Sequence, residues 1–292
     1  TRRVLRRRWE RCVFWPERVV SARTSTDIAR ALARRGHTVT VVTAFPSRVQ
    51  GNGAEAARRG WIRREDHPEG FAVVRCNSFV SRRSSMPSRF LENVSFGIVS
   101  GLVVLLSGKP DLMYANTWPL FAAGIASTVA RIRRIPLVTS IQDIYPESMV
   151  SQSRIGAGGV LEKVLRRMDG WTARGSRALV VISDSFKKVY TATRGVNAAA
   201  VNVIPNWVAE DGVVADDTAA ARLRARFGIA ADDFLVVYGG NVGAAAGVET
   251  LVAAFGHLKG ERRIHCLVAG EGSRLGACRE SAHRMGCDRV HF

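Results

Sequence analysis

The sequence predicts an α/β protein built from two doubly wound parallel sheets, the second of them incomplete. Segments with strand and helix character alternate between residues 39 and 204, which is typical of a parallel sheet with right-handed crossovers. Residues 209–219 are polar and acidic, as expected of a linker. Residues 234–255 then combine an apolar run, a glycine turn and helical periodicity, so a second sheet begins there. We therefore expect one domain over 1–208, a linker over 209–219 and a second domain over 218–292.

The composition indicates a globular protein with a strongly basic first part. The 292 residues are 47% hydrophobic, which suffices for about two ordinary cores. The net charge is +18, and residues 1–83 contribute +12 of it through 19 Arg and no Lys against 7 acidic residues. Such a patch attracts polyanions or an anionic membrane surface, although a general bias toward Arg would give the same count. We do not expect nucleic-acid binding, because no helix-turn-helix, zinc-finger or RNA-recognition motif accompanies the charge.

The cysteines favour a cytoplasmic protein with reduced thiols. Five are present, an odd number without paired spacing. A group made of His265, Cys266, Cys278, His283 and Cys287 lacks any C-x-x-C pair, and part of it lies within a strand-like run, so no bound metal is expected. No signal peptide is expected either, because the N-terminal Arg run is not followed by an apolar core.

The first domain is expected to start irregularly and then to become regular. Charges at 6–8, 10 and 11 interrupt the place of a first buried strand, so residues 1–16 are expected to be frayed or an imperfect start to the domain. Ser21 or Thr24 is expected to cap a helix that Gly36 ends. The remaining expectations are strands at 39–45, 71–75, 111–115, 137–141, 178–182 and 201–204, helices at 91–105, 119–132, 160–173 and 185–191, and a surface loop at 50–70.

The helix expected at 91–105 carries a continuous apolar face. The face consists of Leu91, Val94, Ile98, Leu102 and Leu105. We expect it to pack into the core, and the alternative is a helix lying on a membrane surface. The apolar stretch 94–106 is too short and too interrupted by Ser and Gly to cross a bilayer.

The second domain is expected to contain only part of a sheet. Its expected elements are helices at 218–227, 248–255 and 274–285, and strands at 234–238, 264–269 and from 289 onward. The strand at 234–238 is short, apolar and rich in Val, so it is expected to be fully buried. Three strands make about half of a doubly wound domain, and we expect the natural protein to continue.

The turn after residue 238 has the character of a phosphate-binding loop. Gly239, Gly240, Asn241 and Gly243 leave backbone amides uncovered, and Glu249 stands in the first turn of the helix that follows. The glycine spacing matches neither G-x-G-x-x-G nor G-x-x-x-x-G-K-[ST]. A nucleotide phosphate is the ligand we expect, and the alternative is a turn that only connects a strand to a helix.

Polar residues follow two strands of the first domain, where ligands bind in doubly wound sheets. Asp143 and Glu147 follow the strand at 137–141, and there a carboxylate could act as a base or hold a sugar hydroxyl. The alternative is a solvated acidic turn that caps the next segment. After the strand at 111–115 come Asn116, Thr117 and Trp118, and Trp118 is expected either to pack or to stack on a sugar.

Several motifs together resemble glycosyltransferase family 4, the retaining enzymes of the GT-B fold, and most closely the fucosamine transferase-like branch that builds bacterial surface polysaccharides. The resemblance covers nearly the whole chain. Its motifs are WPE (15–17), DIARALARRGHTVTVVT (27–43), PDLMYANTWP (110–119), IQDIYPES (141–148), LVVISDSFK (179–187), VIPNWV (203–208), VVYGGNVG (236–243), GVETL (247–251) and LVAGEG (267–272).

The resemblance implies two Rossmann-like domains that face each other across a cleft, with the acceptor on the first and a nucleotide-sugar on the second. Asp143 and Glu147 would lie on the catalytic side, and Asn116, Thr117 and Trp118 on the acceptor side. The glycine turn from Gly239 to Gly243 would lie near the donor diphosphate, and the turn formed by Gly270, Glu271 and Gly272 on the nucleotide side. It further implies catalysis without a metal or other cofactor.

Three departures from the family pattern bear on activity. The glycine-rich turn usual after P-E is replaced by residues 18–23, and the basic residue expected after Gly243 is replaced by three Ala at 244–246. The E-x7-E motif that holds the donor sugar would lie beyond Phe292. We therefore expect this chain to bind donor poorly.

The sequence thus predicts a glycosyltransferase, truncated here, that uses a nucleotide-sugar donor and a lipid-linked or polysaccharide acceptor with retention of configuration. We expect it in the cytoplasm, at the inner face of the plasma membrane, because the basic first domain suits an anionic surface. The alternative is a non-catalytic remnant of a nucleotide-sugar-binding fold that docks on anionic membranes.

Overall fold

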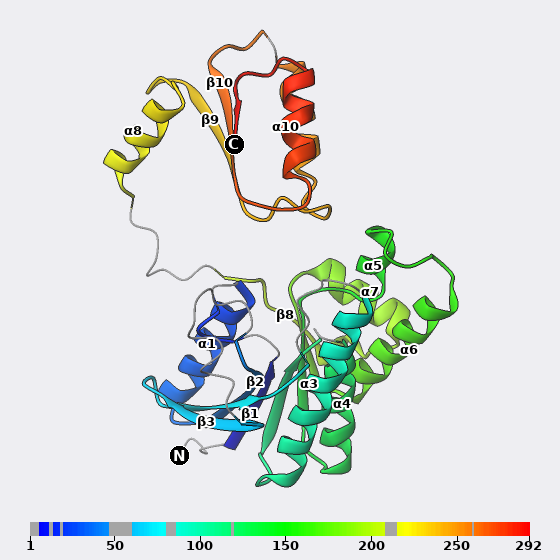
Figure 1. Cartoon of the computed structure of the whole chain (residues 1–292). Coiled ribbons are helices and arrows are strands. Elements are labelled where there is room, and N and C mark those ends of the chain that lie inside the picture. The colour runs from blue at the N-terminus through cyan, green and yellow to red at the C-terminus, as the bar shows by residue number, and fades with distance from the viewer. Residues whose placement is uncertain are drawn as a thin grey trace. The chain divides into compact units, whose positions relative to one another are not determined.

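A computed structural model describes residues 6–11, 14–17, 20–46, 60–79, 86–117, 120–207, 215–258 and 260–292. The chain divides into two compact units, Thr1–Val208 and Ala209–Phe292, each with its own sheet (Figure 1). The two units are described separately below.

The first unit is built on an eight-stranded sheet in the order β3-β4-β2-β1-β5-β6-β7-β8. Every pair of neighbours is parallel except β3 with β4. The strands are β1 (Arg6–Arg11), β2 (Thr38–Ala44), β3 (Ile62–His67), β4 (Phe71–Cys76), β5 (Leu112–Asn116), β6 (Leu137–Ile141), β7 (Ala178–Val181) and β8 (Val201–Val203). The predicted doubly wound α/β architecture is confirmed.

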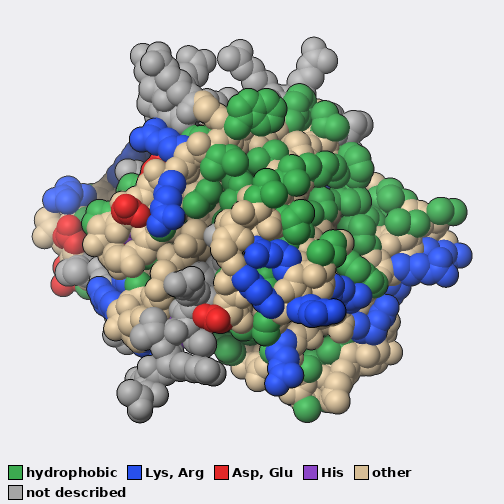
Figure 2. Space-filling view, turned by 90° about the horizontal axis from the view of Figure 1, so that it is seen from below, with side chains coloured by type: hydrophobic (Ala, Val, Ile, Leu, Met, Phe, Trp, Pro, Cys, Tyr) green, Lys and Arg blue, Asp and Glu red, His purple; other side chains and the backbone are tan. Residues whose placement is uncertain are grey.

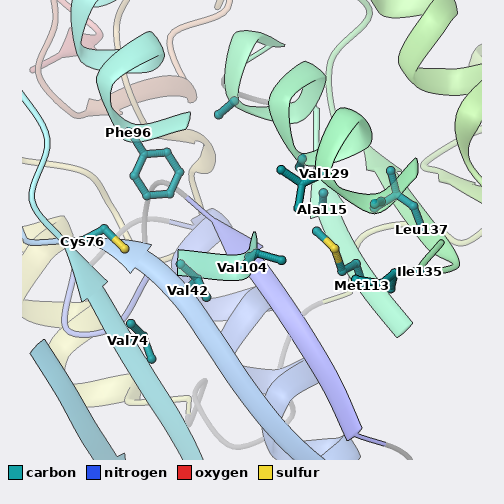
Figure 3. Close-up of a cluster of buried hydrophobic side chains, with 13 residues drawn as sticks. Val42, Val74, Cys76, Phe96, Val104, Met113, Ala115, Val129, Ile135 and Leu137 are labelled. Atoms are coloured by element: carbon teal, nitrogen blue, oxygen red, sulfur yellow. The ribbon is translucent and has the colours of Figure 1, made fainter. Parts of the chain in front are cut away.

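Helices cover both faces of this sheet. They are α1 (Val20–Arg34), α3 (Met86–Leu106), α4 (Leu120–Ile132), α5 (Glu147–Ser151), α6 (Val160–Gly175) and α7 (Asp184–Arg194), followed by a 3-10 turn, η1 (Ala198–Ala200). Side chains alternate across each strand. Val41 therefore packs with Ala29 of α1, whereas Val42 packs with Phe96 of α3 in the cluster of Figure 3.

The start of the domain is more regular than the sequence indicates. Residues 6–11 form β1, which pairs with β2 on one side and β5 on the other. The expectation of a frayed or imperfect start is therefore wrong for residues 6–11, whereas residues 1–5, 12 and 13 lie outside the described residues. Pairing on both sides supplies the ladder hydrogen bonds of a central strand, which the backbone forms independently of side-chain type.

Neither Ser21 nor Thr24 caps helix α1, contrary to the prediction. The helix already begins at Val20, so Ser21 and Thr24 lie within its first turns. The hydroxyl of Thr24 donates to the Ser21 carbonyl at 3.2 Å, a bond to the preceding turn that serine and threonine make inside helices. Gly36 does follow the end of the helix, with φ of +81°.

Part of the predicted surface loop at 50–70 is a strand. Residues Ile62–His67 form β3, an antiparallel edge strand, while 50–59 lie outside the described residues. An edge strand can be polar because one side of it faces water. Glu65 also pairs with the buried guanidinium of Arg75 on β4, at 3.1 Å.

The apolar face predicted for α3 is not in the core. Leu91, Ile98, Leu102 and Leu105 are exposed, each by 38–50%, and Val94 is half-buried. The opposite face contacts α4 instead, through Gly97 and other small residues. Because small residues let two helix backbones approach closely, they decide which side of α3 is buried. No described helix is long and apolar enough to span a membrane.

The second unit holds a three-stranded parallel sheet in the order β11-β10-β9. Its elements are α8 (Asp217–Arg226), β9 (Phe234–Gly239), α9 (Val248–His257), β10 (Ile264–Ala269), α10 (Leu275–Arg284) and β11 (Val290–His291). Val252 of α9, Cys266 of β10 and Cys278 of α10 meet in one core. The prediction that β9 is fully buried is wrong. It is an edge strand, and Phe234 and Val237 are exposed by 66% and 58%.

Candidate functional site

The polar residues that follow strands β5 and β6 of the first unit lie at the same edge of the sheet. Asn116 ends β5 and is paired in register with Ser140 of β6. The amide of Thr117 donates to the Ser140 carbonyl at 3.0 Å, and Asp143 follows two residues beyond the end of β6. Asn116, Thr117 and the Asp143 turn therefore lie at one carboxyl edge, as predicted from their positions. Trp118 lies outside the described residues.

Asn116 offers an acceptor to this edge. Its Oδ1 atom is buried and has no hydrogen-bond partner among the residues that the structure describes. Buried polar atoms are normally paired, so an unpaired one beside a strand end is a place where a ligand donor would be stabilised.

The carboxyl group of Asp143 is suited to hold a hydroxyl. The residue reaches water, yet the surrounding protein removes part of the hydration of the carboxyl group and raises its pKa above the usual value. A hydrogen bond with Tyr145 opposes this shift. A carboxylate with a raised pKa is a better hydrogen-bond acceptor and base than an ordinary one.

Glu147 is held very differently. At the first position of α5, its two carboxylate oxygens meet Arg194 Nη2 at 2.6 Å and Arg166 Nη1 at 3.0 Å. Burial alone would raise the pKa of Glu147, but the hydrogen bond and positive charge of Arg194, helped by Arg166, hold it below the usual value. These contacts favour a positioning role for Glu147, and its predicted part in catalysis stays a prediction.

Arg194 is the centre of a buried polar cluster that the motif analysis missed. It donates through Nε to Asp169 at 2.9 Å and through Nη2 to the Tyr145 carbonyl at 3.0 Å. The Tyr190 hydroxyl also donates to Asp169, at 3.0 Å. Burial raises the pKa of Asp169, and the bonds from Arg194 and Tyr190 oppose that shift. The cluster thus ties α6 and α7 to the loop between Asp143 and Glu147.

A signal for this cluster was present in the sequence. Asp169 is placed four residues after Leu165 on the inward side of α6, and Arg194 four residues after Tyr190 on that of α7. A charge on the inward face of a helix requires a buried partner of the opposite sign. Which two charges pair cannot be found from spacing within one helix.

In the second unit, two glycine turns are packed backbone against backbone. The amide of Gly240 donates to the Ala269 carbonyl at 3.1 Å, and that of Val242 to the Glu271 carbonyl at 2.8 Å. A Cβ on Gly270 would overlap the carbonyl of Gly240, and one on Gly272 would overlap that of Val242. The structure therefore joins the predicted phosphate turn to the predicted nucleotide-side turn, and this close packing by itself requires Gly270 and Gly272.

In the first glycine turn, Gly239–Gly243, several backbone amides have no partner in the described part of the protein. Among the described residues, the amides of Asn241, Gly243 and Ala244 donate to no carbonyl. A Cβ on Gly239 would meet nothing within 4 Å, so the packing of the chain gives no reason for a glycine there. Backbone amides without a protein partner are what a phosphate group needs.

A positive charge near the first glycine turn comes from Arg274, which follows the second glycine turn. The amide of Arg274 donates to the Val242 carbonyl at 3.0 Å, and its side chain lies 3.5 Å from Glu249 in the first turn of α9. The guanidinium is half-exposed. Ala244 and its two neighbours carry no charge, and Arg274, whose guanidinium pairs with Glu249, is a cation close to this turn.

The structure also describes four of the five cysteines, and all four are buried free thiols. Cys266, Cys278 and Cys287 lie in the hydrophobic core of the second unit. Burial raises the pKa of Cys266 to about 11. Within the described ranges, no three His, Cys, Asp or Glu residues form a group that could hold a metal ion.

Comparison of the sequence with known proteins identifies the family of this chain. Residues 21–207 match the family described as "Glycosyl transferase 4-like domain". The putative colanic acid biosynthesis glycosyl transferase WcaI of Escherichia coli K12 is 28% identical over 286 residues, which cover 96% of this chain and 69% of WcaI.

Solved structures show the same fold. Anabaena HepE, crystallised with UDP and glucose, superposes with a TM-score of 0.65 at 16% identity over 99% of this chain and 68% of its own. The lipopolysaccharide glycosyltransferase WaaG gives a TM-score of 0.63 at 16% identity, over 98% of this chain and 69% of its own. Since the family match spans more than half of the sequence, the chain belongs to the glycosyl transferase 4-like family and is a glycosyltransferase of the GT-B fold.

Proposed function

We propose that this protein transfers a sugar from a nucleotide-diphosphate sugar to a lipid-linked or polysaccharide acceptor of the cell surface, with retention of configuration. The relatives support this class of acceptor, since WcaI is a putative glycosyl transferase of colanic acid biosynthesis and WaaG is involved in lipopolysaccharide biosynthesis. HepE binds UDP-glucose, which supports the class of donor. The buried free thiols suit the reducing cytoplasm, where we place the reaction.

The observation that carries the proposal is the first glycine turn. Leaving-group charge develops on the diphosphate as the sugar departs, and fixed amide dipoles stabilise such charge without having to reorganise. The uncovered amides of Asn241 and Gly243, beside the open space at Gly239, can provide this stabilisation. Arg274 can supply the positive charge that Ala244 and its neighbours do not.

On the first unit, we assign the acceptor to the edge formed by Asn116, Thr117 and Asp143. The raised pKa of Asp143 and the unpaired Oδ1 of Asn116 both favour a ligand that donates hydrogen bonds, such as a sugar hydroxyl. Glu147 would fix the position of this loop through Arg194.

Saturation-transfer NMR detects weak binding, so it can test whether this chain binds a nucleotide-sugar donor. The chain would be mixed with a panel of UDP-sugars and GDP-sugars, and with inorganic diphosphate as a competitor. We expect one nucleotide-sugar to give signals that diphosphate reduces. Gly239→Val should abolish them without unfolding the protein, because its side chain enters open space. Gly276→Val on α10, where a Cβ also meets nothing, should leave them unchanged.

The same experiment separates the proposal from its alternatives. If no nucleotide-sugar gives a signal while the chain is folded, the donor assignment is wrong for this chain. If signals persist in Gly239→Val, the donor binds elsewhere. If binding occurs but no UDP or GDP is released in the presence of a lipid-linked saccharide, the non-catalytic alternative is favoured.

A further inference from the structure

The hydrogen bonds between the two glycine turns of the second unit determine which way the peptide groups of the first turn point. In a trans peptide the N–H and the C=O point in opposite directions. Val242 binds the second turn with both groups: its amide donates to the Glu271 carbonyl at 2.8 Å, and its carbonyl accepts from the Arg274 amide at 3.0 Å. The carbonyl of Asn241 and the amide of Gly243 belong to the same two peptides. Both therefore point away from the second turn.

The peptide before Asn241 is oriented by close packing. The carbonyl of Gly240 lies against Gly270, where a Cβ would overlap its oxygen. The amide of Asn241 belongs to this peptide, so it points away from Gly270. The side of the first turn that faces away from the second turn, called the outer side, thus carries the amides of Asn241 and Gly243 and, between them, the carbonyl of Asn241.

A carbonyl in this place would oppose the binding of an anion. Its oxygen carries the negative end of the peptide dipole, so it repels a phosphate that the amides on either side attract. The carbonyl of Gly243 is already engaged, because it accepts from the Ala246 amide at 3.0 Å. The Asn241 carbonyl therefore needs a donor from the protein if the outer side is to hold an anion.

Tyr238 supplies this donor. Its hydroxyl donates to the Asn241 carbonyl at 2.9 Å. The ring packs against the hydrophobic core of the second unit, and the residue pairs in register with Val268 of β10, so the sheet holds the hydroxyl in place. Gly240, with φ of +156°, leaves room for it, since a Cβ there would lie 3.4 Å from the hydroxyl oxygen.

Stability alone gives little reason for this hydrogen bond. Asn241 is exposed, so water could hydrate its carbonyl if the hydroxyl were absent, and the fold would lose little. A hydroxyl fixed by the sheet differs from water because it does not have to reorganise when charge arrives beside it. The bond is therefore better explained by the ligand of the turn than by the fold.

We propose that Tyr238 is a positioning residue of the donor site. Its hydroxyl caps the Asn241 carbonyl, so that the outer side of the first turn offers a diphosphate the amides of Asn241 and Gly243 without an opposing carbonyl dipole. This inference rests on the proposed function, because it takes the ligand of the turn to be the donor diphosphate. Tyr238 acts through the turn and is not itself a catalytic residue.

The test is Tyr238→Phe, which keeps the packed ring and removes only the hydroxyl. Isotope-labelled chain would be titrated with inorganic diphosphate while each backbone amide is followed by heteronuclear NMR. In the unaltered chain we expect the Asn241 and Gly243 signals to move. Tyr238→Phe should weaken diphosphate binding at these signals about three- to tenfold, the value of one hydrogen bond. Tyr114→Phe, on β5 of the first unit, is the matched control and should bind as the unaltered chain does.

A measurement at individual amides is needed because this chain attracts anions elsewhere. Its net charge is +18. Figure 2 shows Lys and Arg side chains gathered in a band on one face of the molecule, beside a group of hydrophobic side chains. Diphosphate is expected to bind loosely at such places. The dissociation constant is therefore taken from the Asn241 and Gly243 signals alone.

Hydrogen exchange separates the positioning role from a structural one. The amides of Gly240 and Val242 join the two turns through the carbonyls of Ala269 and Glu271. If Tyr238 only positions the Asn241 carbonyl, these two amides should exchange as slowly in Tyr238→Phe as in the unaltered chain. Faster exchange of both would show that the hydroxyl holds the turns together, and it would overturn the proposal.

The proposal is also overturned if Tyr238→Phe binds diphosphate as tightly as the unaltered chain, or if the Asn241 and Gly243 signals ignore diphosphate. Its failure is distinguishable from failure of the proposed function. A nucleotide-sugar that binds while these two amides stay unchanged would support the transferase and exclude this role for Tyr238. Diphosphate binding that depends on Tyr238, without binding of any nucleotide-sugar, would support the role and contradict the donor assignment.

Discussion

At the scale of single residues, Arg194 holds the loop that contains Asp143 in place through its contacts with Tyr145 and Glu147. Its side chain is only 1% exposed, and it contacts Asp169, Glu147 and the carbonyl of Tyr145 at once. A buried ion pair is not in itself strongly stabilising, because both charges lose their hydration. Removing one partner is costly, however, because the other charge stays buried and uncompensated.

Arg194→Met is therefore expected to lower the free energy of unfolding by about 3–5 kcal/mol, through the unpaired Asp169. Urea unfolding followed by circular dichroism measures the change. The control is Arg263→Met, which breaks ion pairs with Asp232 and Asp233 that are made by a side chain 66% exposed to water. That change should cost about 1 kcal/mol or less. Equal losses in the two variants would show that the buried cluster has no special weight.

Glu147 gives a prediction that depends on pH. Because its pKa is lowered in the folded state from an ordinary value of 4.5, its ionised form stabilises the fold above that value, and this contribution is lost as the pH falls through the lowered pKa. Glu147→Gln should cost about 1–2 kcal/mol at neutral pH, which is below the roughly 1.5–3 kcal/mol of hydrogen bonds to charged groups because solvent screens a side chain that is 35% exposed. The difference from the unaltered chain should shrink in urea titrations below about pH 4.5. Glu280→Gln, at an exposed position on α10, should show no such trend.

At the scale of elements, the two glycine turns of the second unit behave as one structure. Each turn follows a strand, and the hydrogen bonds from Gly240 to Ala269 and from Val242 to Glu271 hold them together. The position of the uncovered amides of Asn241 and Gly243 therefore depends on the second turn. A change in the second turn should disturb donor binding without touching the donor.

Gly270→Ala tests this coupling. Its methyl group would overlap the Gly240 carbonyl, which is backbone and cannot rotate away. We expect a loss of about 1–3 kcal/mol or more from overpacking, together with weaker nucleotide-sugar signals in NMR. Gly276→Ala, inside α10 and next to open space, should be neutral or stabilising by up to about 1 kcal/mol and leave the signals intact. An unchanged stability of Gly270→Ala would mean that the turns are not tightly packed in solution.

At the scale of the whole molecule, alternation of strands and helices was enough to predict a doubly wound fold. That pattern is local, because each buried strand and each helix face is visible within a few residues. The edge formed by Asn116, Thr117 and Asp143 was predictable for the same reason: carboxyl ends of parallel strands meet at one edge. The central position of β1 was not, because its pairing partners lie far away in the sequence.

Other predictions were wrong or missing because they depend on contacts between elements, which hydrophobic patterns within one element do not reveal. On α3 the choice of buried face was decided by glycine contacts with α4, and hydrophobicity alone favoured the wrong side. On β9 the apolar run suggested burial, but an edge strand in a sheet of three exposes Val237. The pairing of Arg194 with Asp169 joins two helices, so no single-helix pattern reveals it.

The two units have separate cores, which leads to the last prediction. The core of the second unit contains Val252, Cys266 and Cys278, and those of the first contain only residues before 209. Changes confined to one core should open that unit alone. Hydrogen exchange with mass spectrometry should show faster exchange in β9 and β10 for Gly270→Ala, and in β6 and β7 for Arg194→Met, with the other unit unaffected in each case. Faster exchange in both units after either change would instead show that the cores unfold as one cooperative structure, because opening would then be shared across the chain.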